Sequence, residues 1–335
     1  MSRSVFALLF LTACGPRVND TCATSRNGTC DELVGCALGT DSTDCDATCV
    51  EGAWSPDLAA VCAHDLAAET PPAIDPAMGT HGSGGLVGTW DGTVVVRGVY
   101  ASQEVERHYR VYVPRRYDPD VPTPVLFVLG GFGADLYWLA EFTELARTAD
   151  LNDFIVVYGH PEWRDFGPFD VFAWYVYRNA YSGEWEDDPD LAYLRAVSDE
   201  VRALYNVDRT QTFVSGHSRG GMMAVIAAFE MPDVFAGFCA QAGSVTANSY
   251  DDRMRVLAPS HRFGAYVLHG IQDPDMPVSH SDALRDTLVE LGWQEGADLT
   301  YVRLDGVTHD WQHQYNQQMW DLLTAHPLPL QEAAP

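Results

Sequence analysis

The sequence contains no lysine. All 20 of its basic residues are arginines, against 47 acidic residues, so the formal net charge is −27 over 335 residues. No run of basic side chains is present that could neutralise a phosphate backbone and release its counterions. A surface this negative repels phosphate backbones and anionic headgroups, which argues against nucleic acid as a partner. It suits a protein that stays dissolved in an external or periplasmic space.

The N-terminal apolar run, residues 5–11, is far shorter than the about 20 residues needed to span a bilayer. It follows Met-Ser-Arg and predicts a signal peptide. The run ends in Leu11-Thr12-Ala13-Cys14, which resembles the lipobox of bacterial lipoproteins. That resemblance implies that residues 1–13 are removed and that Cys14 carries a lipid anchor to the membrane of the bacterial cell envelope. An ordinary secretory signal is the alternative, and both predict export.

Paired cysteines at the spacing that zinc sites favour are mostly absent. Residues 14–67 instead hold six dispersed cysteines after Cys14, namely Cys22, Cys30, Cys36, Cys45, Cys49 and Cys62. In an exported protein an even count predicts three disulfides, and spacing alone leaves 15 pairings open. The segment 27–45 also resembles, in part, the small calcium-binding Notch-type repeats. A calcium-binding module and a disulfide-stapled spacer both remain open.

Residues 68–92 are rich in Pro, Gly, Thr and Ser and predict a linker. From residue 93 to 328, short β-branched and aromatic runs alternate with helical stretches, which predicts an α/β domain with a mostly parallel sheet covered on both faces. The eight expected strands are 93–99, 108–113, 125–129, 154–158, 211–214, 235–241, 264–268 and 299–304. The expected helices are 134–150, 190–205, 219–231, 281–291 and 314–325, the second of them capped by Asp190.

The most specific motif is G-x-S-x-G, which runs from Gly216 through Ser218 to Gly220. It stands between an expected strand and an expected helix, the context of a nucleophile elbow. Glycines on both sides remove the Cβ atoms that would clash in so tight a turn. The helix that follows directs its positive end at the site. The motif predicts Ser218 as a nucleophile.

A serine hydroxyl needs a base to take its proton and a carboxylate to orient that base, and in this fold the chain order is Ser, acid, His. Asp273 lies on the loop expected for the acid, and Asp275 is its rival. His309 follows the last expected strand and is the candidate base. His313 is a substitute that lies at the expected helix start. Structural roles beside the site are expected for the remaining histidines near these motifs, His217 and His269.

An oxyanion hole needs two backbone N–H donors, one from the residue after the nucleophile and one from the loop after the third strand. Arg219 is the first candidate. Phe132, in the glycine-rich segment 130–133, is the second. This chemistry needs no cofactor and no metal.

From about residue 106 to 311 the chain resembles the exported polyhydroxybutyrate depolymerase and feruloyl esterase family of α/β-hydrolases. The resemblance is carried by Tyr109-Arg110-Val111-Tyr112-Val113-Pro114, Tyr117-Asp118, segments 124–131 and 205–208, Gly220-Gly221-Met222-Met223 and segment 269–273. It implies that Ser218, Asp273 and His309 are nucleophile, acid and base, and that Phe132 and Arg219 form the oxyanion hole. Gly130, His217 and Arg219 depart from the family's more common residues.

The resemblance implies an exported serine esterase that cleaves polyhydroxyalkanoate-like or hydroxycinnamoyl esters, small or polymeric. A serine peptidase on the same fold and a non-catalytic surface binding protein are the alternatives. The aromatic-rich stretch 163–185 can line a substrate cleft or simply pack over the sheet, with packing preferred. Cys239 lies in an apolar strand with no evident partner and predicts a buried free thiol.

Overall fold

The computed structural model describes residues 78–82, 84–98, 103–165, 170–176, 188–245 and 262–329. The expectations for the signal peptide, the Cys14 anchor and the cysteine-rich module fall outside these residues. Within them, no helix is long and apolar enough to cross a bilayer.

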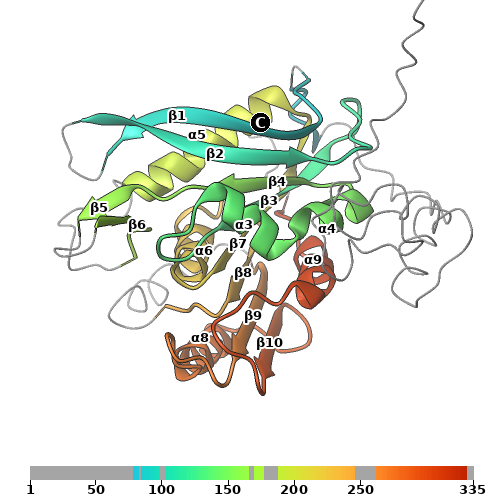
Figure 1. Cartoon of the computed structure of the whole chain (residues 1–335). Coiled ribbons are helices and arrows are strands. Elements are labelled where there is room, and N and C mark those ends of the chain that lie inside the picture. The colour runs from blue at the N-terminus through green and yellow to red at the C-terminus, as the bar shows by residue number, and fades with distance from the viewer. Residues whose placement is uncertain are drawn as a thin grey trace, which may run out of the picture. The chain divides into compact units, whose positions relative to one another are not determined.

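The predicted α/β sheet is present, and its eight strands follow the order β1-β2-β4-β3-β7-β8-β9-β10 (Figure 1). In this order, each strand from β4 to β9 pairs in parallel with the next one, whereas β2 pairs antiparallel with both β1 and β4. The bounds are β1 Gly88–Arg97, β2 Glu104–Val113, β3 Thr123–Leu129, β4 Ile155–Gly159, β7 Val207–His217, β8 Gly237–Gln241, β9 Gly264–Gly270 and β10 Leu299–Leu304. A separate hairpin pairs β5 Trp163–Asp165 with β6 Asp170–Phe172.

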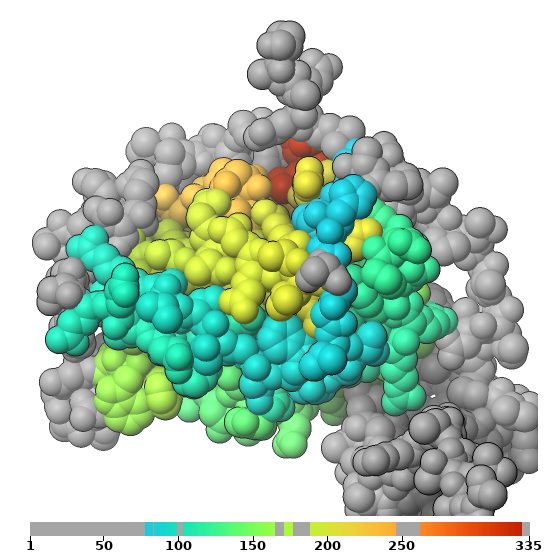
Figure 2. All heavy atoms as spheres, turned by 90° about the horizontal axis from the view of Figure 1, so that it is seen from above, coloured from blue at the N-terminus to red at the C-terminus, as the bar shows by residue number. Residues whose placement is uncertain are grey.

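Helices cover both faces of the sheet. Their bounds are α3 Leu136–Thr143, α4 Leu145–Asn152, α5 Pro189–Leu204, α6 Arg219–Glu230, α8 Ser279–Glu290, the short 3₁₀ helix η5 His313–Tyr315 and α9 Asn316–Thr324. Side chains of α5, α6 and α8 belong to one buried apolar cluster, and those of α3, α4 and α9 belong to the other. Figure 2 shows α5 beside the β1–β2 ribbon on one side of the molecule.

Strand β3 shows why the sheet separates two cores. Val125, Phe127 and Leu129 point into the cluster with α5 and α6, while Leu126 and Val128 point into the cluster with α3 and α4. Successive side chains of a strand alternate between faces, so a strand buried on both sides must be apolar throughout. The unbroken apolar run that predicted this strand therefore reflects its central place in the sheet.

Some predicted bounds were wrong. The first strand begins at Gly88 rather than at residue 93, because Gly88 to Arg97 pair in register with all of β2. Part of the predicted linker also contacts the domain, since the N–H of Thr80 donates to Val207 O and the N–H of Gly84 donates to Leu204 O.

The helix predicted over 134–150 is two helices. Glu144 ends α3 and begins α4 with φ 51° and ψ 25°. A left-handed residue cannot continue a right-handed helix, so the chain changes direction there.

The predicted cap of the second helix was also wrong. The side chain of Asp188 accepts the N–H groups of Asp190 and Leu191, so Asp188 is the N-cap of α5. Asp190 is instead fully buried and paired with two arginines, Arg107 and Arg164.

Candidate active site

The candidate catalytic residues follow the carboxyl ends of parallel strands. Strand β3 lies between β4 and β7 in the sheet. The chain therefore passes from β3 to its neighbour on one side, β4, and later forms its neighbour on the other side, β7. Leu129 at the end of β3 is paired with Gly216 near the end of β7. Such a reversal of strand order opens a crevice where ligands bind in α/β proteins. The segments after β3 and β7 hold Phe132 and Ser218.

Ser218 joins β7 to α6 in a strained conformation, with φ 56° and ψ −123°. A non-glycine residue in this region costs about 1–3 kcal/mol, and such strain gathers at functional sites. The glycines around it permit the close turn, because a Cβ atom on Gly216 would lie 2.1 Å from the carbonyl oxygen of Gly220. The N–H of Ser218 donates to Gln241 O at 2.9 Å, which fixes the turn against β8. Ser218 thus has the backbone geometry of a nucleophile elbow.

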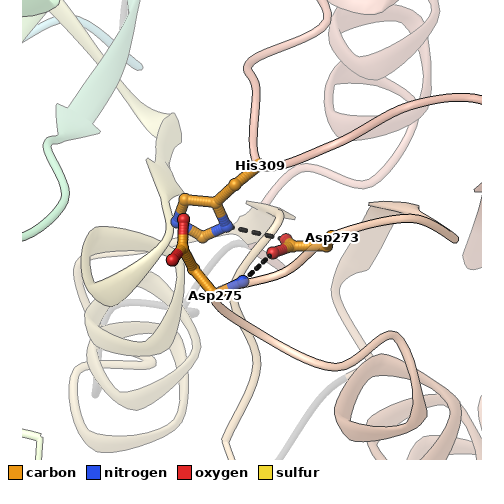
Figure 3. Close-up of side chains that lie close together, drawn as sticks. All are labelled: Asp273, Asp275 and His309. Atoms are coloured by element: carbon orange, nitrogen blue, oxygen red, sulfur yellow. Dashed lines mark hydrogen bonds and ion pairs between the residues drawn. The ribbon is translucent and has the colours of Figure 1, made fainter.

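Asp273 and His309 form a direct hydrogen bond, with 2.7 Å between His309 Nδ1 and Asp273 Oδ2 (Figure 3). They come from the loops after β9 and β10, and these loops are bonded to each other, since the N–H of Gln272 donates to Val307 O. The Asp273 side chain is fully buried and that of His309 is 18% exposed. The structure therefore brings together the acid and base that the sequence selected from separate loops.

The environment of Asp273 favours its charged form. Burial alone would raise its pKa, but the N–H of Met276, the bond from His309 and the N–H of Asp275 together lower the pKa below its ordinary value. The two backbone N–H groups donate to Oδ1 at 2.8 Å each. A carboxylate held in this way can orient an imidazole and stabilise it when it becomes protonated.

His269 lies beside the site, as predicted, and gives Asp273 a second imidazole partner, a bond that the sequence did not predict. His269 Nε2 lies 3.1 Å from Asp273 Oδ2 and 2.9 Å from Met276 O, while Nδ1 lies 2.7 Å from Ser281 Oγ. Because Nε2 faces two acceptors, it carries the proton, and Nδ1 accepts from the Ser281 hydroxyl. Burial lowers the pKa of His269. The only signal in the sequence is its position four residues before Asp273.

The two rivals occupy different places. The carboxylate of Asp275 is exposed and lies on the side of the His309 ring away from Asp273 (Figure 3). His313 is exposed in η5, at a helix start as predicted. Asp273, Asp275 and His309 bring ligand atoms within 4.8 Å of one another, so they could in principle share a cation. However, Asp273 and His309 already bond to each other, which fits a proton relay better than a metal centre.

His217 connects the elbow with the candidate base. Its ring centroid lies 4.8 Å from that of His309 and 5.1 Å from that of Phe142. Burial, with a smaller contribution from the neighbouring His309, lowers the pKa of His217 to about 3, so the ring is neutral. A neutral imidazole can pack beside His309 without competing for its proton. The residue next to Ser218 in sequence is thus in contact with His309.

The loop of residues 130–133 lies directly against Ser218. A Cβ atom on Gly131 would be 3.1 Å from Ser218 Cβ, and Gly133 turns the chain with φ 75°. The N–H of Gly133 donates to Phe172 O at 2.8 Å. Phe132 is 53% exposed at the tip of this loop. Arg219 is the first residue of α6 and directly follows Ser218.

Other residues that support the site had no clear signal in the sequence. Gln241 Oε1 accepts the N–H of Gln312 at 2.8 Å, which ties the His309 loop to the end of β8. Trp174, fully buried, donates its indole N–H to Gly130 O at 2.9 Å. Trp174 and Tyr175 are buried, as the packing interpretation of the aromatic stretch predicts, but Trp163 of the same stretch is 51% exposed. Phe166, Phe169, Tyr177, Tyr181 and Trp185 lie outside the described residues.

Comparisons with known proteins agree with the fold. A family model described as "Putative esterase" matches residues 101–325. A curated relative, the "Putative esterase NocK" of Nocardia uniformis subsp. tsuyamanensis, is 34% identical over 92 residues, which are 28% of this chain and 25% of the relative. The "Bifunctional acetylxylan esterase/xylanase XynS20E" of Neocallimastix patriciarum is 25% identical over 141 residues, 42% of this chain and 18% of the relative. The chain thus spans a quarter or less of the length of these relatives.

Among solved structures, a putative dipeptidyl aminopeptidase IV from Bacteroides ovatus superposes with a TM-score of 0.50 at 13% identity, over 71% of this chain and 36% of that one. At this identity the likeness shows the shared fold and nothing of the substrate. The family match covers most of the chain and includes Ser218, Asp273 and His309. The chain therefore belongs to the putative-esterase family, with the α/β-hydrolase fold.

Proposed function

We propose that the protein is an exported serine esterase that hydrolyses carboxylic esters through an acyl-enzyme on Ser218. The observation that carries the proposal is the strained elbow at Ser218, within an esterase-family chain whose loops also bond His309 to Asp273. A strained turn is costly to maintain, so its conjunction with an acid-bonded imidazole supports a catalytic role.

The chemistry follows from these groups. The Ser218 oxygen attacks the ester carbonyl carbon while His309 Nε2 takes the hydroxyl proton, and the C=O electron pair moves onto oxygen. The backbone N–H groups of Phe132 and Arg219 stabilise that oxyanion. The intermediate collapses, the alcohol leaves with the proton from His309, and an acyl-serine remains. Water, deprotonated by His309, then releases the acid and restores Ser218.

Replacing the nucleophile tests the proposal. We expect Ser218→Ala to lose at least about 10³-fold in kcat on a nitrophenyl ester, because only binding and the oxyanion hole would remain. Ser215→Ala is the matched control, since Ser215 lies in the same strand and its buried hydroxyl donates only to Phe127 O. It should retain kcat within about twofold. Full activity of Ser218→Ala, or failure of a fluorophosphonate probe to label the wild type at Ser218, would contradict the proposal.

Exposed aromatic side chains border the site and support large or polymeric esters as substrates. Trp138 is 44% exposed and stacks on Phe142 at 4.2 Å, and Phe142 in turn contacts His217. Trp163 is 51% exposed and packs edge-on against Phe172, whose carbonyl oxygen accepts the Gly133 N–H of the Phe132 loop. Flat apolar rings suit a hydroxycinnamoyl group or a polyester chain.

A substrate panel separates the candidate esters. It contains short nitrophenyl esters, hydroxycinnamoyl esters, polyhydroxybutyrate and, because one relative is named for acetylxylan, acetylated xylan. We expect kcat/KM for the hydroxycinnamoyl or polyhydroxyalkanoate substrate to exceed that for short esters. Aminoacyl amides cleaved faster than any ester would instead favour a serine peptidase.

Export and anchoring rest on the N-terminal sequence. The signal-like residues 1–13 and Cys14 support a lipid anchor, and the six following cysteines support a disulfide-stapled module ahead of the catalytic domain. Labelled palmitate should enter the wild type and be absent from Cys14→Ala. Denatured, unreduced protein should titrate one thiol, that of Cys239, which is buried and unpaired as predicted. Additional titrating thiols would contradict the disulfide module.

A further inference from the structure

Trp174 lies between the two segments that supply the proposed oxyanion donors. It is fully buried, two residues beyond the end of β6. Its ring covers Gly159 at the end of β4, where a Cβ atom would come within 3.3 Å of the indole. Its position is therefore fixed by packing at the same edge of the sheet as Ser218.

The side chain of Trp174 holds the first of these segments. Its indole N–H donates to Gly130 O at 2.9 Å, and this bond is buried. At the other end of the same loop, the N–H of Gly133 donates to Phe172 O. Both ends of the four-residue loop that carries the Phe132 N–H are thus bonded to the segment that contains Trp174.

The main chain of Trp174 holds the second segment. Its carbonyl oxygen accepts a hydrogen bond from Arg219 Nε at 2.7 Å. The backbone N–H of Arg219 is the second proposed donor. Trp174 therefore contacts the loop of Phe132 through its side chain and Arg219 through its backbone carbonyl.

The segment itself is anchored by a buried ionic cluster. The N–H of Tyr175 donates to Asp190 Oδ2 at 2.6 Å, and Arg164 donates both to Asp190 Oδ2 at 2.6 Å and to the carbonyl of Ala173. Arg107 pairs with the other oxygen of Asp190 at 2.7 Å. Burial alone would raise the pKa of Asp190, but the two arginines lower it, so the carboxylate stays charged. The Asp190 carboxylate is thus held by both arginines and by the Tyr175 N–H, which ties the segment to the start of α5.

We propose that Trp174 is a positioning residue that holds the two backbone donors of the oxyanion hole at the separation the transition state requires. This inference rests on the proposed esterase function. It concerns only the geometry of the hole, because Trp174 itself donates no bond to the substrate. The role predicts a loss of transition-state stabilisation with little change in ground-state binding.

Trp174→Phe tests this role by removing the indole N–H and keeping an aromatic ring. We expect kcat to fall by about 10- to 100-fold, the range for a misplaced catalytic group, with KM changed less than about threefold. Trp293→Phe is the matched control. Trp293 is also buried and donates its indole N–H to a backbone carbonyl, that of Phe263, at 2.8 Å, but it packs in the core beneath α6 and α8. It should lose comparable stability and keep kcat within about twofold.

A reversible inhibitor distinguishes positioning from partial unfolding. The Ser218 oxygen adds to the carbonyl carbon of a trifluoromethyl ketone, its proton passes to His309, and the resulting oxyanion lies in the hole. The inhibition constant of this ketone should rise in Trp174→Phe by the same factor as kcat/KM falls, with kcat calculated per active site titrated with a fluorophosphonate. If Trp174→Phe only lowered the folded fraction, the inhibition constant would stay unchanged. An unchanged inhibition constant would therefore overturn the proposal.

Arg219→Met is the second variant, which carries the test if Trp174→Phe does not fold. It removes the Nε donor to Trp174 O and keeps the backbone N–H, so kcat should again fall by about tenfold. Wild-type kcat in either folded variant would overturn the role of Trp174. Activity in Ser218→Ala would instead overturn the serine mechanism, so the two failures are distinguishable.

Discussion

The substitution Asp273→Asn puts the assignment of the acid to a direct test. Asp273 Oδ1 accepts the N–H groups of Asp275 and Met276, and Oδ2 accepts from His309 and His269. The two backbone donors cannot become acceptors, so the amide oxygen of the substituted side chain must take the Oδ1 position. Its NH₂ group then faces His309.

Facing an NH₂ donor, His309 has to present a lone pair on Nδ1 and carry its proton on Nε2. In that tautomer the imidazole cannot take the proton of Ser218. A triad in the wrong tautomer loses about 10⁴-fold in kcat, which corresponds to about 5 kcal/mol. We expect a loss of this size in Asp273→Asn, measured as kcat/KM on a nitrophenyl ester at neutral pH, with thermal unfolding followed in parallel.

Asp275→Asn is the matched control on the same loop. It keeps the backbone N–H that Asp273 accepts and removes one exposed charge whose distance from His309 is within 4.8 Å. At that separation in water the charge contributes about 0.9 kcal/mol, roughly fivefold in rate. The reasoning is refuted if Asp275→Asn loses thousandfold while Asp273→Asn stays active, since Asp275 would then be the acid.

Two further predictions concern stability. Burial, with a further contribution from the charge of Asp190, raises the pKa of Asp188 from 3.8 to about 7. Between these pH values the folded protein keeps a proton that the unfolded chain has released, so the free energy of unfolding falls as the pH rises from about 4 to 7. Asn also caps helices, so Asp188→Asn should show a smaller drop in Tm between pH 5 and pH 8 than the wild type, and an equal drop would contradict the assignment. Arg164→Met leaves buried Asp190 with one arginine fewer and should lower the free energy of unfolding in urea by about 3 kcal/mol. Arg195→Met, which breaks a pair about half exposed on both sides, should cost less than about 1 kcal/mol, and equal costs would show that burial does not decide the difference.

The order of strands and helices along the chain was predictable because each element has its own local pattern of apolar and polar residues. Each of the eight strands of the main sheet overlaps a predicted run, and the elbow follows from one motif in the correct context. Glu144, by contrast, gave no signal that it would adopt a left-handed conformation and split a helix, since nothing about a glutamate in an amphipathic stretch favours that backbone state. The short β5–β6 hairpin was also missed, because strands of three residues are too brief for a period to show.

The sequence by itself determined the chemical candidates: a serine flanked by glycines after a buried strand, and acids and histidines in the right chain order. It favoured Asp273 as the acid from its place on the loop but left Asp275 as a rival, because the two are alike in type and lie on one loop. The tertiary structure decides which of them meets His309, since the two loops come from strands that are neighbours only in the folded sheet. It alone reveals the bonds that His269 makes to Asp273 and Trp174 makes to Gly130, because side-chain hydrogen bonds depend on positions fixed by the packing of the whole domain.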